Sequence, residues 1–314
     1  MTTSTGLHHV TAMAGHARRN LDFYTQTLGL RFVKKTVNFD DPGTYHFYFG
    51  DAVGTPGTII TFFPWGDAAP GRVGAGETQE TAFAVPVGSL DGWEMRLADL
   101  GVEAGAIVTR FGERVLPFAD PDGMRLSLVE TAWAAGVPAW DGGPLADDAA
   151  IRGFASVTLG LANPAATATV LTEVFGWRHA GTEAGRQRFV APGDGTHPGH
   201  VVDLVTVGGG RGRLGAGSVH HIAFRAASDA DQAAMAAALG RLGVPATEQK
   251  DRNYFRSIYF REPGGVLFEI ATDDPGFAVD ESVETLGTRL MLPEQYETAR
   301  ARIEAVLPDL GAAS

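Results

Sequence analysis

The sequence contains no cysteine, which excludes disulfide bonds, thiolate metal ligands and a cysteine nucleophile. It also lacks any apolar run near the roughly 20 residues of a membrane-spanning helix, so no membrane partner is expected. Positive charge is scarce. The sequence has 25 Lys and Arg but 37 Asp and Glu, which gives a formal net charge of −12. An acidic surface repels phosphate backbones, and we therefore expect no nucleic-acid partner. The first ten residues lack the basic and then apolar layout of a signal peptide, which predicts a cytoplasmic protein.

What the sequence does contain is one pattern repeated four times. Each copy opens with a short strand-like run, continues with a helix-like segment that ends at a glycine, and closes with three more strand-like runs. The chain therefore predicts four βαβββ modules. They span residues 7–65, 80–131, 153–206 and 219–272.

The predicted modules group into two halves. Ala, Gly, Pro and Asp cluster between the second and third modules, at residues 132–152. We expect an N-terminal two-module domain over residues 1–140 and a C-terminal two-module domain over 150–275. The tail, residues 276–314, is predicted to carry a polar helix around 293–306.

Equivalent positions of the four modules carry different potential ligands. The inward position of the first strand holds, in chain order, His9, Phe83, Ser156 and His221. The position four residues after the turn glycine of the last strand holds Thr61, Ser127, Asp203 and Glu269.

Only the first and fourth modules together supply two imidazoles and one carboxylate, from His9, His221 and Glu269. Two His and one carboxylate on one face of a metal leave other positions open, as in the facial triad of non-heme Fe(II) oxygenases. This interpretation requires the first and fourth modules to share one barrel. The second and third modules would then form a second barrel without a metal.

The alternative is that these polar residues are structural, since a single His in a strand usually is. Two His-His pairs in equivalent positions, at 8–9 and 220–221, favour the metal site. Glu269 also interrupts the apolar run 266–270, and a carboxylate there is costly unless it is paired or bound to a metal. Asp203 is a rival ligand, but its own barrel has no His, so a surface or hydrogen-bonded carboxylate is expected.

The four modules resemble the vicinal oxygen chelate superfamily, which includes glyoxalases and extradiol dioxygenases. The resemblance implies an α+β fold in which paired modules curl into two half-open barrels. Six stretches narrow it to the hydroquinone-type ring-cleaving dioxygenases, which open para-hydroquinones with Fe(II) and O₂. These stretches are residues 7–11, 31–38, 45–51, 54–58, 251–265 and 292–297.

Through this resemblance, His9, His221 and Glu269 are the expected ligands of Fe(II), for which Mn(II) could substitute. The expected pocket residues are His8, Thr11, His220 and Arg252, and His220 is the first candidate for moving a proton, with His8 second. Tyr259 is expected to hydrogen-bond the Glu269 carboxylate.

Each supporting residue also has a structural alternative. Strand neighbours point to opposite faces, so His8 and His220 could lie in the core or in solvent. Thr11 is a good strand former and Arg252 could form an exposed salt bridge. Core packing is expected for Phe62, Phe63 and Trp65.

The expected partners are a small aromatic substrate, O₂ and further copies of the same chain. Three rival functions remain. A glyoxalase-like lyase or isomerase usually needs a second carboxylate where Thr61 stands, and a catechol dioxygenase would need a His where Ser156 stands. A metal-free binding module of the same fold is the third.

Overall fold

The computed structural model describes residues 3–311 as two curled eight-stranded sheets. The first sheet has the strand order β14-β15-β16-β13-β1-β4-β3-β2, and the second has the order β10-β11-β12-β9-β5-β8-β7-β6. The strands of the first are β1 (Leu7–Ala14), β2 (Arg31–Asn38), β3 (Asp41–Gly50), β4 (Ile59–Pro64), β13 (Ser218–Ala226), β14 (Lys250–Asp251), β15 (Phe255–Arg261) and β16 (Leu267–Pro275). The strands of the second are β5 (Glu77–Val85), β6 (Val108–Arg110), β7 (Glu113–Ala119), β8 (Arg125–Glu130), β9 (Phe154–Leu161), β10 (Arg178–Glu183), β11 (Arg186–Val190) and β12 (Val201–Thr206).

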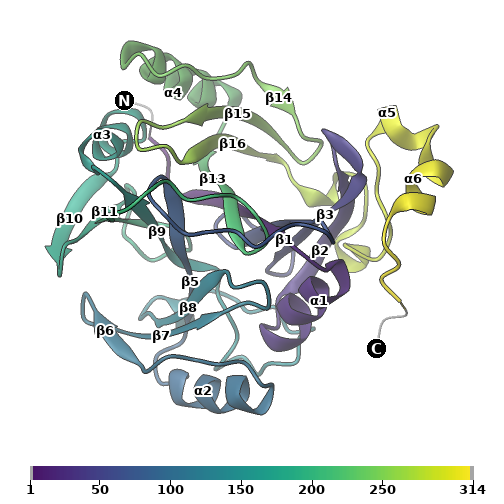
Figure 1. Ribbon diagram of the computed structural model, residues 1–314, viewed down its shortest axis with the longest axis horizontal. Helices are drawn as coiled ribbons and strands as arrows, with labels where there is room; N and C mark the ends of the chain where they lie inside the picture. Colours follow the sequence, from purple (N-terminus) through teal and green to yellow (C-terminus); the bar gives the residue numbers. More distant parts are fainter. Residues whose placement is uncertain (1–2, 312–314) are drawn as a thin grey trace.

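The sheets join modules across the two halves of the chain (Figure 1). Antiparallel pairing of β1 with β13 joins the first module to the fourth, and pairing of β5 with β9 joins the second to the third. The predicted pairing of modules is therefore confirmed, as is the α+β fold of two half-open barrels. The predicted domains, residues 1–140 and 150–275, divide the sequence into two halves. Each sheet takes one module from each half, so the sheets do not test this division, and it stays a prediction.

Each module carries its helix where the sequence predicts one. The helical segments are α1 (Ala17–Asp22) with η1 (Phe23–Thr27), α2 (Leu90–Asp99), α3 (Ala165–Thr169) with η3 (Val170–Val174), and α4 (Asp229–Arg241). In the first and third modules the last turn widens into a π-helix. The glycines that follow adopt positive φ, at Gly29, Gly101, Gly176 and Gly243, which stops each helix without the strain that a Cβ would add. No helix among residues 3–311 has the length and apolar character to span a membrane.

The tail differs from the single helix expected around 293–306. It contains the short helical turns η4 (Phe277–Val279) and η5 (Val283–Thr285), then two separate helices, α5 (Glu294–Glu297) and α6 (Arg300–Val306). One further turn, η2 (Ala134–Gly136), lies between the second and third modules. The hydroxyl of Tyr296 donates to the carbonyl oxygen of Phe39 at 2.7 Å, which fixes α5 against the turn between β2 and β3, and the helix restarts only after Ala299. Figure 1 shows α5 and α6 at the edge of the first sheet, beside β3.

The tail also fastens the loop that precedes β15. Lys34 is fully buried and forms ion pairs of 2.6 Å with both Asp280 and Glu281. The Tyr254 hydroxyl donates to Asp280 at 3.0 Å, and the Tyr254 ring stacks on Phe277 with centroids 5.0 Å apart. A buried lysine is tolerated only when its charge is paired, and the two carboxylates pair it here. Because Asp280 also accepts from Tyr254, the cluster connects the loop before β15 to β2.

A buried carboxyl group links the first and second modules. Asp120 accepts hydrogen bonds from the backbone N–H groups of Asp122 and Met124 and from the hydroxyl of Tyr24 in η1. Burial raises the pKa of Asp120 from 3.8 to about 6, although the backbone hydrogen bonds oppose this. Because the folded-state pKa is raised, the stability that Asp120 contributes is present below pH 4 and is lost as the pH rises through about 6.

We predict that Asp120→Asn removes this pH dependence. Asparagine keeps the acceptor for the two backbone N–H groups but cannot ionise. Relative to wild type, the variant should gain about 3 kcal/mol of unfolding free energy between pH 3.5 and pH 7.5, since each pKa unit is worth about 1.4 kcal/mol. Urea unfolding of both metal-free proteins at the two pH values measures it. A stability difference that stays constant with pH would contradict the assignment.

Candidate active site

Three neighbouring strands of the first barrel bring one carboxylate and two imidazoles together. His9 lies on β1, His221 on β13 and Glu269 on β16, and their exposed fractions are 2%, 5% and 0%. The Glu269 Oε2 atom is 3.3 Å from His9 Nε2 and 2.9 Å from His221 Nε2, and the two Nε2 atoms are 3.3 Å apart. The structure thus brings together the residues that the sequence singled out from opposite ends of the chain.

This group fits a divalent metal ion. Metal–ligand bonds of about 2.0–2.2 Å that meet at right angles give ligand–ligand distances of about 3 Å, as observed here. The Glu269 Oε1 atom accepts a hydrogen bond from Ser257 Oγ, whereas Oε2 is buried and has no hydrogen-bond partner among the described residues. A buried carboxylate oxygen in that position calls for a cation. Among residues 3–311, no other group of His, Asp and Glu converges in this way.

Local electrostatics keep the carboxyl group of Glu269 ionised. Burial alone would raise the pKa of Glu269, but the adjacent His9 and His221 imidazoles hold it well below its usual value. Burial also lowers the pKa of His221. A divalent metal binds a carboxylate in its ionised form and imidazoles in their neutral form, so the lowered pKa values of Glu269 and His221 both favour metal binding.

Each of the two ligand histidines contacts the His that precedes it. The Nδ1 atoms of His8 and His9 are 3.0 Å apart, and those of His220 and His221 are 2.8 Å apart. The two outer imidazoles differ in position. His8 is 2% exposed, and its buried Nε2 has no hydrogen-bond partner among residues 3–311, whereas His220 lines the cavity in front of the group. Burial, together with His221, lowers the pKa of His220 to about 4, so this ring is neutral at neutral pH.

A cavity of about 340 Å³ lies in front of the metal-binding group. Its lining is largely aromatic, with polar residues beside it. The lining residues are His9, Asn38, Phe39, Asp40, His46, Tyr48, Phe63, Trp65, His220, His221, Thr247, Lys250, Arg252, Phe255, Tyr259 and Leu267. Two hydrogen bonds hold the guanidinium group of Arg252 in the cavity wall. Its Nε donates to the Tyr259 hydroxyl at 3.2 Å, and its Nη2 donates to Asp40 at 3.1 Å.

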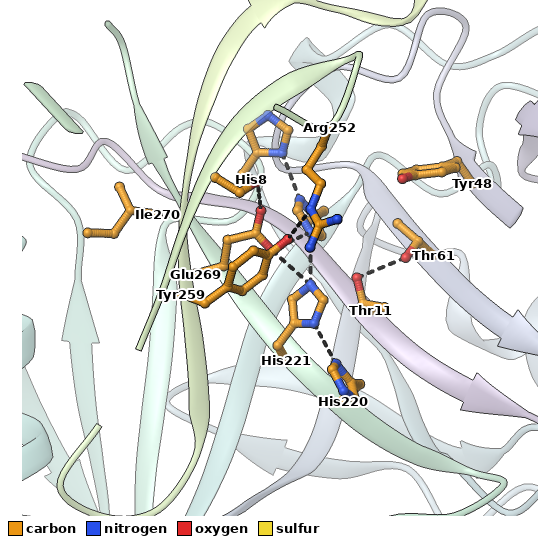
Figure 2. Close-up of polar contacts among 12 residues, drawn as sticks. His8, Thr11, Tyr48, Thr61, His220, His221, Arg252, Tyr259, Glu269 and Ile270 are labelled. Carbon is orange, nitrogen blue, oxygen red and sulfur yellow. Dashed lines mark hydrogen bonds and ion pairs between the residues drawn. The ribbon is translucent and has the colours of Figure 1, made fainter. Parts of the chain in front are cut away.

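The structure corrects the partner expected for the Glu269 carboxylate. Tyr259 lies directly opposite Glu269 in the pairing of β15 with β16, but its hydroxyl accepts from Arg252 (Figure 2). Ser257 makes the hydrogen bond to Glu269 instead. The tyrosine side chain extends past the carboxylate, whereas the short serine two residues earlier reaches it diagonally across the strands.

Other expectations meet mixed outcomes. The sequence predicts that Thr11 and His8 both line the pocket, and neither does. Thr11 is fully buried, with its hydroxyl 2.8 Å from that of Thr61, and His8 is 2% exposed because alternate residues of a strand face opposite sides. Phe62 is a core residue as expected, but Phe63 and Trp65 line the cavity. Sequence reasoning missed His46, Tyr48, Asp40, Phe255 and Ser257. The signal for His46 and Tyr48 is their same-face spacing on β3, where both polar groups face the cavity.

The second barrel holds an ion-pair cluster at the equivalent place. Asp203 is 1% exposed and accepts hydrogen bonds from Arg188, with distances of 2.9 and 3.0 Å, and from Arg186 at 3.4 Å. Of the two environments expected for Asp203, a surface position or a hydrogen-bonded one, the structure shows the hydrogen-bonded one, and the carboxylate is buried. Both of its oxygens are already neutralised by arginine.

Comparison with known proteins places the chain in a family. The sequence model of the Glyoxalase/Bleomycin resistance protein/Dioxygenase superfamily matches residues 6–128 and 153–270. The chain belongs to this superfamily. It is 48% identical to "Putative ring-cleaving dioxygenase MhqO" of Bacillus subtilis, over 95% of this chain and 94% of that protein. It is 34% identical to chlorohydroquinone/hydroquinone 1,2-dioxygenase of Sphingobium indicum, over 97% and 96%.

Solved structures agree with the fold. A crystal structure of a "putative dioxygenase" from Bacillus subtilis superposes with a TM-score of 0.94 at 47% identity and covers 98% of both chains. Glyoxalase I from Zea mays superposes with a TM-score of 0.65 at 13% identity, covering 85% of this chain and 92% of that chain. At that identity the maize enzyme supports the fold alone.

We predict that His9→Ala, His221→Ala and Glu269→Gln each lose divalent metal binding. Three ligands hold the ion, so removing one leaves too few donors for tight binding. Ser257→Ala should weaken binding by a smaller amount, about 10–100-fold, because it only orients the carboxylate. Anaerobic Fe(II) titration followed by elemental analysis measures metal content and affinity.

Asp203→Asn is the matched control, since it changes the equivalent carboxylate of the other barrel. It should bind as much metal as wild type, although it removes the charge that pairs with Arg186 and Arg188. Loss of iron in Asp203→Asn as complete as in Glu269→Gln would refute the assignment of the ligands to the first barrel.

Proposed function

We propose that this protein is an Fe(II)-dependent dioxygenase that opens the ring of a para-hydroquinone with O₂. The observation that carries the proposal is a three-ligand group, His9, His221 and Glu269, that faces an aromatic-lined cavity holding a fixed arginine. The names of the similar proteins support the reaction type, and one of those names specifies hydroquinones. A cytoplasmic location and association of identical chains stay predictions.

In this proposal His9, His221 and Glu269 hold the metal, and Mn(II) could replace Fe(II). Bound Fe(II) would supply open positions for the substrate phenolate and O₂. It would also supply the redox chemistry for the reaction between them, because O₂ alone reacts only slowly with an aromatic ring. The protein's own contribution is to exclude water, to orient the ring and to manage protons and charge around it.

The contact between the two Nδ1 atoms ties the tautomer of His220 to that of His221. If His221 held a metal through Nε2, its proton would lie on Nδ1, and this N–H would donate a hydrogen bond to Nδ1 of His220. The neutral His220 ring must then carry its own proton on Nε2. His220 therefore offers a hydrogen-bond donor to a substrate oxygen, which suits an acid or a charge-stabilising role.

Arg252 supplies a fixed positive charge in the cavity. Asp40 and Tyr259 fix both ends of its guanidinium group, so little freedom is lost when an anionic ring binds. A phenolate oxygen would meet a cation that is already oriented. Phe63, Trp65 and Phe255 provide apolar surfaces for the ring itself.

The rival functions lack such support. A glyoxalase-like lyase or isomerase would usually place a second carboxylate at Thr61, whose hydroxyl is instead bound to Thr11 and His46. A metal-free binding module would leave the buried Oε2 of Glu269 beside two imidazoles and without a hydrogen-bond partner among the described residues. A catechol dioxygenase would need a His where Ser156 stands, and a comparison of substrates tests this rival directly.

We predict faster oxygen uptake with para-hydroquinones than with matched catechols. His220→Ala and Arg252→Ala should lower turnover with unchanged iron content, because neither residue is a ligand. For His220→Ala the expected loss is about 10²–10⁴-fold, the usual contribution of a general acid or base. An oxygen electrode and elemental analysis on the iron-loaded proteins provide the two measurements.

The control is His179→Ala, which removes an exposed His from the second barrel and should leave turnover unchanged. Uptake with catechols alone would move the protein to the catechol-cleaving class. An unaltered rate in His220→Ala would exclude that residue from the reaction.

A further inference from the structure

Tyr48 places a hydroxyl group in the buried part of the cavity. The lining residues that are buried are His9, Tyr48, Phe63, His221 and Phe255. Two of these are candidate ligands and two are phenylalanines. The other polar lining residues are partly or fully exposed. Tyr48 is thus the most buried polar side chain of the cavity wall outside the metal-binding group.

The hydrogen bonds behind Tyr48 fix the direction of its proton. The Thr61 hydroxyl donates its single proton to that of Thr11 at 2.8 Å. In the 2.8 Å contact between Thr61 and His46 Nε2, the donor must therefore be His46. A neutral imidazole carries one N–H, so His46 Nδ1 is an acceptor, and the Tyr48 hydroxyl donates to it at 2.9 Å.

Burial keeps both rings in the forms that this arrangement requires. It lowers the pKa of His46 well below the ordinary value, so the imidazole is neutral. It raises the pKa of Tyr48 well above the ordinary value, so the phenol keeps its proton. That proton is committed to His46. The Tyr48 oxygen has no other hydrogen-bond partner among residues 3–311, and its lone pairs are available to a ligand in the cavity.

One apolar ring lies close to both Tyr48 and the metal-binding group. The ring centroid of Phe255 is 5.0 Å from that of His9 and 6.5 Å from that of Tyr48, and all three rings line the cavity. Figure 2 shows Tyr48 on the side of the site away from Glu269. An aromatic substrate that packs on Phe255 can therefore direct one end at the metal-binding group and the other end at Tyr48.

The two oxygen atoms of a para-hydroquinone match this arrangement. They lie at opposite ends of the ring, and loss of one proton makes loss of the second harder, because two like charges would share one molecule. A para-hydroquinone bound as a phenolate thus keeps a hydroxyl donor at its far end, and a buried donor needs an acceptor. The second hydroxyl of a catechol lies beside the first and cannot reach the far end.

We propose that the Tyr48 oxygen accepts a hydrogen bond from the protonated hydroxyl at the far end of a bound para-hydroquinone, and that Tyr48 thereby selects this class of substrate. The inference rests on the proposed function for which end of the substrate meets the metal-binding group. Tyr48 touches the substrate, whereas His46 is a positioning residue that holds the Tyr48 proton away from it. No covalent bond forms or breaks in this contact.

Three phenols with different para substituents test the contact in the binding step alone. Hydroquinone can donate a hydrogen bond to Tyr48, 4-methoxyphenol has the oxygen but no proton there, and 4-methylphenol has neither. Tyr48→Phe removes only the hydroxyl of the side chain. Anaerobic calorimetric titration of the iron-loaded proteins measures each dissociation constant, and elemental analysis measures the iron content.

Tyr48→Phe should weaken the binding of hydroquinone about 10-fold, because the buried hydroxyl of the substrate loses its acceptor. Binding of 4-methoxyphenol and 4-methylphenol should not weaken, since neither donates to Tyr48, and the iron content should equal that of wild type. An equal loss for all three phenols would show a merely structural effect. An equal loss for hydroquinone and 4-methoxyphenol would show that Tyr48 donates. Either result would overturn the proposal.

Tyr45→Phe is the matched control. Tyr45 is a buried tyrosine of the same strand, β3, but it lies on the opposite face, where its ring packs against Phe47 with centroids 5.0 Å apart. It does not line the cavity. All three phenols should bind to Tyr45→Phe as they bind to wild type. A loss of hydroquinone binding as large as that of Tyr48→Phe would contradict a specific role for Tyr48.

Oxygen uptake separates this inference from the proposed function. If wild type binds hydroquinone through Tyr48 but consumes no O₂ with it, the proposed function fails and the contact stands. If wild type opens hydroquinones, and Tyr48→Phe has an unchanged dissociation constant and an unchanged KM, the contact is refuted and the proposed function stands.

Discussion

The site depends on one buried carboxylate whose charge is only half satisfied by the protein. Ser257 holds one oxygen of Glu269, and the other faces two imidazole nitrogens with no hydrogen bond of its own. An unmatched charge in a fully buried position would cost several kcal/mol if nothing bound there. A divalent cation removes this cost, and the neighbouring imidazoles are already placed to share it.

The arrangement of the modules makes this convergence possible. Pairing β1 with β13 places the first and last modules side by side, so ligands separated by most of the chain meet at one point. The other barrel uses the same geometry differently. There two arginines pair with Asp203, and Phe83 and Ser156 stand where the first barrel has its ligand histidines. Within residues 3–311, the second barrel therefore lacks a metal-binding group and can serve as structural support.

Sequence patterns could predict the modules, their pairing and the convergence of His9, His221 and Glu269, because these depend on repeat spacing and on strand alternation. They could not identify Ser257, since strand pairing points to Tyr259 and only side-chain length decides which hydroxyl reaches Glu269. They also missed His46 and Tyr48, whose importance comes from hydrogen bonds across β3, β4 and β1. They predicted helix in the tail at 293–306 but not the break that divides it into α5 and α6, which tertiary contacts such as that of Tyr296 with Phe39 decide.

The most direct test of this account is anomalous X-ray scattering at the iron edge from crystals loaded anaerobically with Fe(II). The account predicts one strong peak per chain at about 2.0–2.2 Å from His9 Nε2, His221 Nε2 and Glu269 Oε2, an ordinary metal–ligand distance. A peak elsewhere in the chain, or beside Asp203, would contradict it, as would fully loaded protein with no peak between the three residues.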